Sequence, residues 1–205
     1  MTTPDKPTTT PQADPRDLLF GAAEQVRRLT TQTRPDQWAA PTPCAEFDVL
    51  GLGQHLVGVL YRVAHVADGS DAFGVPSVRD DVPAERIVAE LEAGLAAARD
   101  AWSDDAVLTR TLNLPFGQMP GAGAAVMYVN ELSTHAWDLA MAIGAREELD
   151  DRFAEIAEPI ARQYIPDGPR EQIPFGPAQE VAAQAPAYER LAAWTGRDPN
   201  WTPGT

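Results

Sequence analysis

The sequence predicts an all-α fold, a four-helix bundle with short extra helices at its C-terminal end. Apolar residues recur at three- and four-residue spacing along nearly the whole chain, which is the period of an amphipathic helix. Hydrophobic residues make up 44% of the 205 residues, a share large enough to form a packed core. Four long helical segments with one long crossover connection are typical of a bundle, in which sites are built from side chains of facing helices.

The first two helices are predicted over residues 14–31 and 49–67. Asp48 is a suitable N-cap for the second helix, because its carboxylate can accept hydrogen bonds from amides of the first turn. The connection between the two helices is rich in proline, and we expect its Trp38 and Phe47 to cover the end of the core.

The same periodicity predicts the remaining helices. The helices are expected over 83–102, 122–143, 150–164 and 187–195. Between two of them, the alternating residues 107–121 are expected to form either a short strand pair or an extended crossing. Gly144 can adopt the left-handed conformation that ends the helix before it. Residues 68–82 are expected to form a loop.

Composition and charge exclude several classes of protein. Sixteen Lys and Arg against thirty Asp and Glu give a net charge of −14, which disfavours binding to nucleic acid or to an anionic membrane. No segment approaches the ~20 apolar residues that span a bilayer. Residues 1–14 lack the apolar stretch of a secretion signal and are expected to be a disordered arm before a single domain over 15–201. A cytoplasmic location follows as the expectation, because the single Cys44 excludes an internal disulfide.

Glu131, His135 and Asp138 form the group of residues most indicative of chemistry. Spacings of four and three residues place all three on one face of the predicted helix 122–143. The apolar neighbours of this face indicate that it points inward, where unpaired carboxylates cost free energy. A divalent metal is the simplest partner that three such groups could share.

His55 completes the predicted metal site from the second helix. It lies within the apolar stripe of that helix, whereas His65, ten positions later, is rotated off the stripe and is interpreted as solvated. Two imidazoles and one carboxylate are the ligand set of catalytic zinc, with one position left for water or substrate. Ni²⁺ and Fe²⁺ are compatible with the same donors.

Each of these residues also has a structural interpretation. A histidine on an apolar face is commonly a core residue bonded to a backbone carbonyl, and a Glu–His pair at this spacing is commonly a hydrogen bond on a solvated face. Cys44 is interpreted as a small buried residue outside the site. Trp137 is expected to pack between helices.

Three segments resemble a known family: TPCAEFDVLGLGQHLVG, ELSTHAWDLAMAIG and FGPAQEVAAQAPAYERLAAWTGRDPNW. They are similar to actinobacterial metal-binding proteins related to the mycothiol-dependent maleylpyruvate isomerase N-terminal domain, within the wider DinB-like superfamily. The likeness covers about residues 15–201. It implies a bundle with an up-down-down-up path and a metal between the helices, held by the residues at positions His55, Glu131 and His135.

The resemblance implies a thiol-dependent enzyme, either a transferase or an isomerase of the maleylpyruvate isomerase type. A metal, with Zn²⁺ favoured, would stabilise the thiolate of a low-molecular-weight thiol such as mycothiol, which then attacks a small electrophile. Asp138 would orient a ligand of the metal. Loops 68–82 and 109–121 are expected to form the rims of the site.

Two other classes stay open at this point. One is a non-catalytic bundle that binds a metal or a small molecule; a structural metal normally takes four protein ligands, so Asp138 would be the fourth. The other is an apolar bundle that serves as an interaction module and binds no metal. Self-association into a homodimer is compatible with each of these classes.

Overall fold

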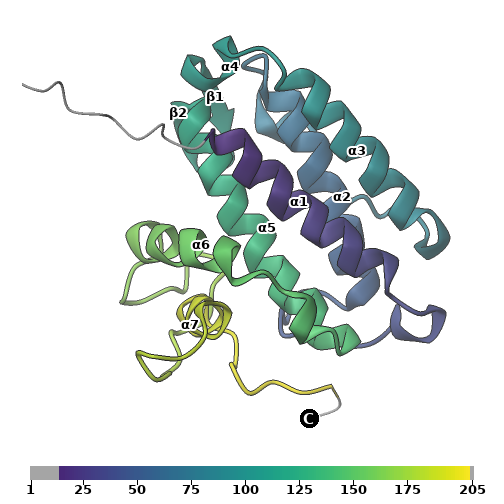
Figure 1. Ribbon diagram of the computed structural model, residues 1–205, viewed down its shortest axis with the longest axis vertical. Coiled ribbons are helices and arrows are strands. Elements are labelled where there is room, and N and C mark those ends of the chain that lie inside the picture. Colours follow the sequence, from purple (N-terminus) through teal and green to yellow (C-terminus); the bar gives the residue numbers. More distant parts are fainter. Residues whose placement is uncertain (1–13, 204–205) are drawn as a thin grey trace, which may run out of the picture.

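The computed structural model describes residues 14–203, which form a mostly helical protein with one small antiparallel sheet (Figure 1). The bounds of its elements are α1 Pro15–Thr31, α2 Val49–Val66, α3 Ile87–Ala101, α4 Ala106–Thr109, β1 Thr111–Leu114, β2 Gly117–Pro120, α5 Gly121–Ile143, α6 Asp151–Tyr164 and α7 Ala187–Trp194. The mostly helical structure agrees with the predicted all-α class, and of the two conformations expected for residues 107–121 the structure has the strand pair. Of the arm expected over 1–14, residues 1–13 lie outside the described part of the chain.

The ends of the long helices follow from their capping residues. The carboxylate of Asp14 accepts from the backbone N–H of Arg16 at the start of α1. Asp48 accepts from Gly51 N–H at 2.7 Å, as expected for the N-cap of α2. Gly144 has φ +74° and ends α5 in the left-handed conformation that favours glycine.

The structure differs from the prediction around the third helix. The expected helix 83–102 begins with a 3₁₀ turn at Ala84–Arg86, and regular α3 starts only at Ile87. A further helix, α4, follows after a short break. It is four residues long, so it is too short for a repeating apolar pattern to reveal it.

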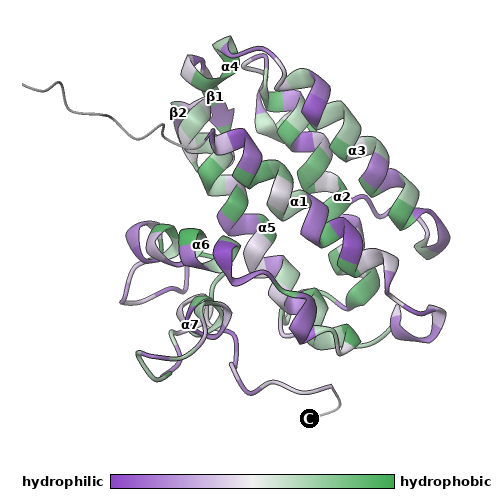
Figure 2. Ribbon diagram, in the orientation of Figure 1, coloured by the Kyte–Doolittle hydropathy of each residue, from purple (hydrophilic) through white to green (hydrophobic). Residues whose placement is uncertain are grey.

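The larger core lies among the four long helices. α1 packs against α5 and α3, and α2 packs against α3 and α5, so these helices lie side by side (Figure 1). Their buried apolar side chains form one core. Each helix carries both hydrophobic and hydrophilic residues along its ribbon, as amphipathic helices do (Figure 2). Trp38 and Phe47 are partly buried against this core, as expected.

α6 and α7 form a second, smaller core against α5. Trp137 of α5 is 1% exposed, and its ring stacks on that of Tyr188 of α7 at 6.4 Å. Trp137 therefore packs between helices, as predicted. This second core places the last part of the chain beside α5, close to the residues of the candidate site.

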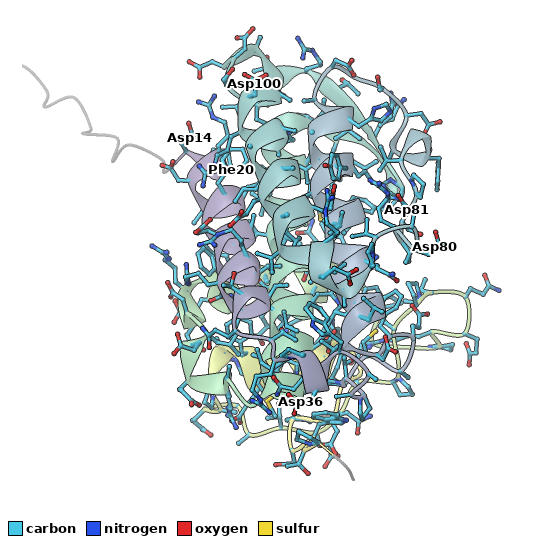
Figure 3. The ribbon with its side chains drawn as sticks, turned by 90° about the vertical axis from the view of Figure 1, so that its right-hand side faces the viewer. Asp14, Phe20, Asp36, Asp80, Asp81 and Asp100 are labelled. Carbon is cyan, nitrogen blue, oxygen red and sulfur yellow. The ribbon has the colours of Figure 1, made fainter. Side chains whose placement is uncertain are left out.

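The acidic side chains labelled in Figure 3 lie on the outer surface. Asp36, Asp80, Asp81 and Asp100 are all exposed; Asp80 and Asp81 are neighbours in one loop, whereas Asp36 and Asp100 come from other segments. Within residues 14–203 no helix combines the length and the hydrophobicity needed to cross a membrane.

Candidate metal centre

His55 lies on the inner side of α2. Leu52 and Val59, three residues before it and four after it, are buried in the core, so the predicted apolar stripe does point inward. The His55 side chain is 11% exposed. Because α2 packs against α5, this imidazole lies between the two helices.

Glu131 and His135 lie one turn apart on the face of α5 that meets α2. α5 packs against α1, α2, α6 and α7, and most of its residues are therefore buried. The His135 side chain is 8% exposed, whereas that of Glu131 is 37% exposed. The carboxylate is thus open to the space beside the two imidazoles.

The structure brings the three predicted side chains together, with both imidazoles facing the carboxylate of Glu131. Its Oε1 lies 3.0 Å from Nε2 of His55 and 3.8 Å from Nε2 of His135. The two imidazole rings are 4.8 Å apart and inclined by 72°. One donor atom from each of the three residues can be chosen so that all lie within 4.8 Å of one another, close enough to hold one metal ion.

The other nitrogen of each imidazole is held by an oxygen. His55 Nδ1 lies 2.8 Å from the carbonyl oxygen of Ser77, and His135 Nδ1 lies 3.0 Å from Oδ2 of Asp138. A proton on each Nδ1 satisfies these contacts and leaves Nε2 as the atom that can bind a metal. Both rings are therefore oriented as histidine ligands of metals usually are.

Electrostatics favours an anionic Glu131. Burial alone would raise the pKa of its carboxyl group, but the hydrogen bond from His55 and the charge of His135 outweigh burial and lower the pKa to about 2. Burial acts in the opposite direction on His55, and the hydrogen bond to Glu131 raises its pKa. A protonated His55 places one positive charge beside the Glu131 carboxylate, at the position that a bound metal cation could take instead.

Asp138 and Arg197 form a buried ion pair behind His135. Nε and Nη2 of Arg197 donate to the two carboxylate oxygens of Asp138 at 3.2 and 3.0 Å. Burial would raise the pKa of Asp138, but the guanidinium charge and the hydrogen bond from His135 lower it. Asp138 therefore stays anionic, and it holds His135 rather than facing Glu131.

A cavity of about 190 Å³ opens beside these residues. Its lining comes from α2, α5, the connection between α1 and α2, the loop that follows α2, and the last part of the chain. The lining residues are Cys44, Glu46, Phe47, His55, Ser77, Asn130, Glu131, Thr134, His135, Pro174, Phe175 and Arg197.

Cys44 belongs to this cavity, and the expectation that it lies outside the site is wrong. A donor atom of Cys44 lies within 4.8 Å of donor atoms of His135 and Asp138. Burial raises the pKa of the Cys44 thiol, and the charge of Asp138 adds to the effect. The predicted burial of Cys44 is confirmed. Its neighbours come from α5, far away in the sequence, so no local pattern indicates them.

Phe47 and Arg197 are further residues of the site that sequence reasoning did not identify. The Phe47 ring stacks on His55 at 5.1 Å and 21°, and Arg197 is buried beneath Asp138. The sequence did indicate the approximate place of Phe47, because this residue was expected at the end of the core. No sequence pattern indicates that Arg197 belongs to the site, since its partner Asp138 lies 59 residues earlier in the chain.

Of the two loops expected at the rim of the site, only one lines the cavity. Loop 68–82 does reach the cavity, through Ser77. Segment 109–121 contributes no lining residue, so that expectation is wrong. It forms the hairpin directly before α5, and ten helical residues, about 15 Å, separate Gly121 from Glu131.

His65 lies apart from the candidate centre, as predicted, but it is not simply solvated. It is half-buried, and its Nε2 lies against Gly74, where an added Cβ would come within 2.6 Å. Among residues 14–203, His65 belongs to neither group of possible metal ligands.

The fold and the site define a class of protein: a helical protein with a candidate divalent-metal centre and an adjoining cavity. The family described as "Mycothiol maleylpyruvate isomerase N-terminal domain" matches residues 19–140, and the chain belongs to this family. Two uncharacterized proteins of Mycobacterium tuberculosis, Rv0738 of strain H37Rv and MT0763 of strain CDC 1551, are each 30% identical to it over 187 residues. Each alignment covers 90% of this chain and 98% of the relative. No solved structure matches significantly.

Proposed function

We propose that the protein is a divalent-metal-dependent enzyme that uses a low-molecular-weight thiol of the mycothiol type on a small electrophilic substrate. The observation that carries the proposal is the convergence of two imidazole Nε2 atoms on Oε1 of Glu131. The name of the family supports the choice of thiol. The reaction would be a thiol transfer or an isomerisation.

The residues present fit a metal. His55 and His135 would bind it through Nε2, and Glu131 would bind it through its carboxylate, which is a ligand set of catalytic zinc. Ni²⁺ and Fe²⁺ accept the same donors. When bound, the metal would stabilise the thiolate form of the thiol, which is the reactive nucleophile.

The chain's own residues orient the ligands and shield the site. The carbonyl of Ser77 and the carboxylate of Asp138 hold the two imidazoles, and Arg197 keeps Asp138 in place. Phe47 and Phe175 line the cavity and would exclude water from the apolar part of a substrate.

An open catalytic site is favoured over a closed structural one. A structural metal would need a fourth protein ligand, and Asp138 was the candidate. Its carboxylate contacts Nδ1 of His135 and the guanidinium of Arg197, whereas Glu131 faces Nε2 of the same ring. The cavity beside the three donors supports a position open to thiol and substrate.

The family resemblance extends the proposal to the fold. A DinB-like four-helix bundle with an up-down-down-up path, formed as a single domain over residues 15–201, is supported by the packing of α1, α2, α3 and α5 around one core.

Cobalt-substituted protein tests the proposal. Titration with a low-molecular-weight thiol is expected to produce a thiolate-to-cobalt absorption band that saturates at one thiol per metal. The band should be lost in His135→Ala, which removes a ligand, and retained in His65→Ala, which changes a histidine away from the site. A metal-loaded protein that gives no such band would contradict thiol binding at the metal.

The competing function is a non-catalytic bundle that binds a metal or a small molecule, and the cavity is compatible with it. Thiol consumption in the presence of a panel of small electrophiles separates the two functions. Turnover that disappears in His135→Ala supports the enzyme. A protein that forms the cobalt–thiolate band but turns over none of the electrophiles favours the binding function.

A further inference from the structure

The charges around the cavity are few, and their balance bears on what can enter it. Among residues 14–203, the charged lining residues apart from the two imidazoles are Glu46, Glu131 and Arg197. The remaining polar residues of the lining carry no charge: Cys44, Ser77, Asn130 and Thr134. Two negative charges and one positive charge therefore surround a molecule in the cavity.

The positive charge of Arg197 is already balanced. Its Nε and Nη2 atoms donate to the two carboxylate oxygens of Asp138 at 3.2 and 3.0 Å, and its Nη1 donates to the carbonyl of Thr195. Asp138 and Arg197 are both buried, so the two charges act on the cavity as a neutral pair. Arg197 thus offers a negatively charged ligand no unbalanced positive charge.

Arg62 does not supply the missing cation. It lies two turns after His55 on α2, but it is absent from the lining of the cavity. Its Nε and Nη2 atoms donate to the carbonyls of Ala72 and Val75 at 3.1 and 2.8 Å. The guanidinium of Arg62 is therefore held by the loop that follows α2.

The charge of Glu131 belongs to the candidate metal centre. Its carboxylate offsets one of the two charges of a divalent ion, and the two imidazoles bind such an ion as neutral ligands. The thiolate of the proposed function offsets the second charge. The centre is thus neutral overall at the moment when the electrophile approaches it.

Glu46 is the charge that this balance leaves over. It is exposed, lies in the connection between α1 and α2, and forms no ion pair within residues 14–203. Burial and the charge of Asp138 raise the pKa of the Cys44 thiol most, and the charge of Glu46 adds to them. The carboxylate of Glu46 therefore acts on the same cavity that Cys44 lines.

We infer that the electrophilic substrate carries no negative charge, and that Glu46 determines this specificity. A substrate carboxylate would give up hydration on entering the cavity and would meet Glu46 without a free cation to compensate. An uncharged substrate avoids this cost, and Phe47, Pro174 and Phe175 offer it apolar contacts. This inference rests on the proposed function, because it counts a thiolate at the metal.

Three 2-chloroacetamides that differ only in the group on nitrogen test the inference. The N-propyl compound is uncharged, the N-(2-carboxyethyl) compound is an anion and the N-(2-aminoethyl) compound is a cation, with the charge remote from the reacting carbon. The thiolate sulfur forms a bond to that carbon while the C–Cl bond breaks, and chloride leaves with the bonding electrons. The probe thiol is 2-mercaptoethanol, which brings no further charge.

The zinc-loaded protein should discriminate against the anion. Its kcat/KM, divided by the uncatalysed rate constant for each compound, should be about fivefold lower for the anion than for the uncharged compound. An effect of that size corresponds to one unit charge roughly 4 Å away in water. The cation should react at least as well as the uncharged compound.

Alkylation of Cys44 provides a second readout that does not depend on turnover. Cys44 is the single cysteine of the sequence and lines the same cavity, so intact mass measures one adduct. The corresponding iodoacetamides should alkylate the full-length metal-free protein, checked for folding by circular dichroism, with the same discrimination against the anion. Each rate is divided by that of 2-mercaptoethanol. The discrimination should shrink as ionic strength rises from about 0.01 M to about 1 M, because the Debye length falls from about 30 Å to about 3 Å.

Substitutions of Glu46 connect the discrimination to one carboxylate. Glu46→Gln should abolish it in both readouts, and Glu46→Lys should reverse it so that the anion is preferred. Glu155→Gln is the matched control, because it changes the net charge equally at an exposed residue of α6 that does not line the cavity. This variant should discriminate as the wild type does.

The outcomes separate this inference from the proposed function. Equal catalysed rates for the three chloroacetamides, or a discrimination that persists in Glu46→Gln, would overturn the inference and leave the proposed function standing. A Cys44 that reacts with none of the iodoacetamides would also overturn it, because the cavity would not admit them. Charge-selective alkylation of Cys44 without catalysed thiol consumption would uphold the exclusion of anions by Glu46 and contradict the proposed function.

Discussion

His55 and His135 are oriented by oxygens of different kinds. His55 Nδ1 meets a backbone carbonyl from a loop, whereas His135 Nδ1 meets the carboxylate of Asp138 on its own helix. A carboxylate partner raises the basicity of an imidazole more than a carbonyl does. The carboxylate, however, brings a buried negative charge, and Arg197 balances it.

The Asp138–Arg197 pair is therefore expected to be essential for stability. Arg197→Met leaves the Asp138 carboxylate buried without its cation, and the free energy of unfolding should fall by about 3–5 kcal/mol, measured by urea denaturation. Arg86→Ala is the control, because the Arg86 side chain is 62% exposed and the loss of its ion pair with Glu90 should cost about 1 kcal/mol or less. Equal losses in both variants would contradict the account.

The candidate ligands could be predicted from the sequence because helix geometry relates them. Glu131 and His135 share a helix face by their spacing, and His55 lies in an apolar stripe. Whether these three residues hold a metal stays a prediction. Cys44 and Arg197 could not be assigned to the site in this way, because only tertiary packing brings them beside His135 and Asp138.

At the scale of elements, α2 and the loop that follows it meet at a glycine. A Cβ at Gly58 would come within 2.8 Å of the carbonyl oxygens of Pro76 and Ser77. The Ser77 carbonyl is the group that holds His55 Nδ1. The absence of a side chain at Gly58 thus lets the loop approach closely enough to orient His55.

Gly58→Ala should consequently disturb the site as well as the packing. The loop must move away, and we expect zinc affinity to fall roughly 10–100-fold, as for the loss of other groups that orient metal ligands. Competition with a zinc chelator measures the change. Gly123→Ala is the matched control: its Cβ would make only ordinary contact with Met119, and it should stabilise α5 by about 0.5–1 kcal/mol. Unchanged zinc affinity in Gly58→Ala would contradict the role given to Ser77.

The long helices were the most predictable elements. Their apolar periods extend over several turns, and Asp48 and Gly144 mark two of their ends. The 3₁₀ turn at Ala84–Arg86 and the single turn of α4 were not predicted. Such short elements depend on local packing rather than on a repeating pattern.

At the scale of the whole molecule, the last part of the chain closes one side of the site. Residues 166–177 are held by Arg170, whose guanidinium donates to the carbonyls of Pro166, Gly176 and Trp194. This segment carries Pro174 and Phe175 to the cavity, and Arg197 follows α7.

A close backbone contact between Gly176 and Gly196 holds residues 166–177 against the segment that follows α7. Gly196 has φ +81°, and a Cβ there would lie 2.5 Å from Gly176, so Gly196→Ala introduces both backbone strain and a clash. We expect faster limited proteolysis within residues 166–186 and a lower melting temperature. Gly168→Ala, at a position with open space, should leave both unchanged. Equal protection of segment 166–186 in Gly196→Ala and wild type would show that this contact does not hold the segment.

Removal of the metal is expected to leave the fold largely intact. The cores contain many fully buried side chains away from the site, among them Leu19, Leu91 and Trp102. Chelation should therefore lower the melting temperature by only a few degrees, roughly what a loss of about 1 kcal/mol produces in a protein of this size. Unfolding upon chelation, followed by circular dichroism, would instead indicate a structural metal.

The metal content of protein purified without a histidine tag tests the central claim most directly. Elemental analysis should find one divalent metal per chain in the wild type and in His65→Ala. The metal should be lost in His55→Ala and His135→Ala, with circular dichroism confirming that both variants are folded. Equal metal content in all four proteins, or no metal in the wild type after reconstitution with Zn²⁺, would contradict a metal centre at His55, Glu131 and His135.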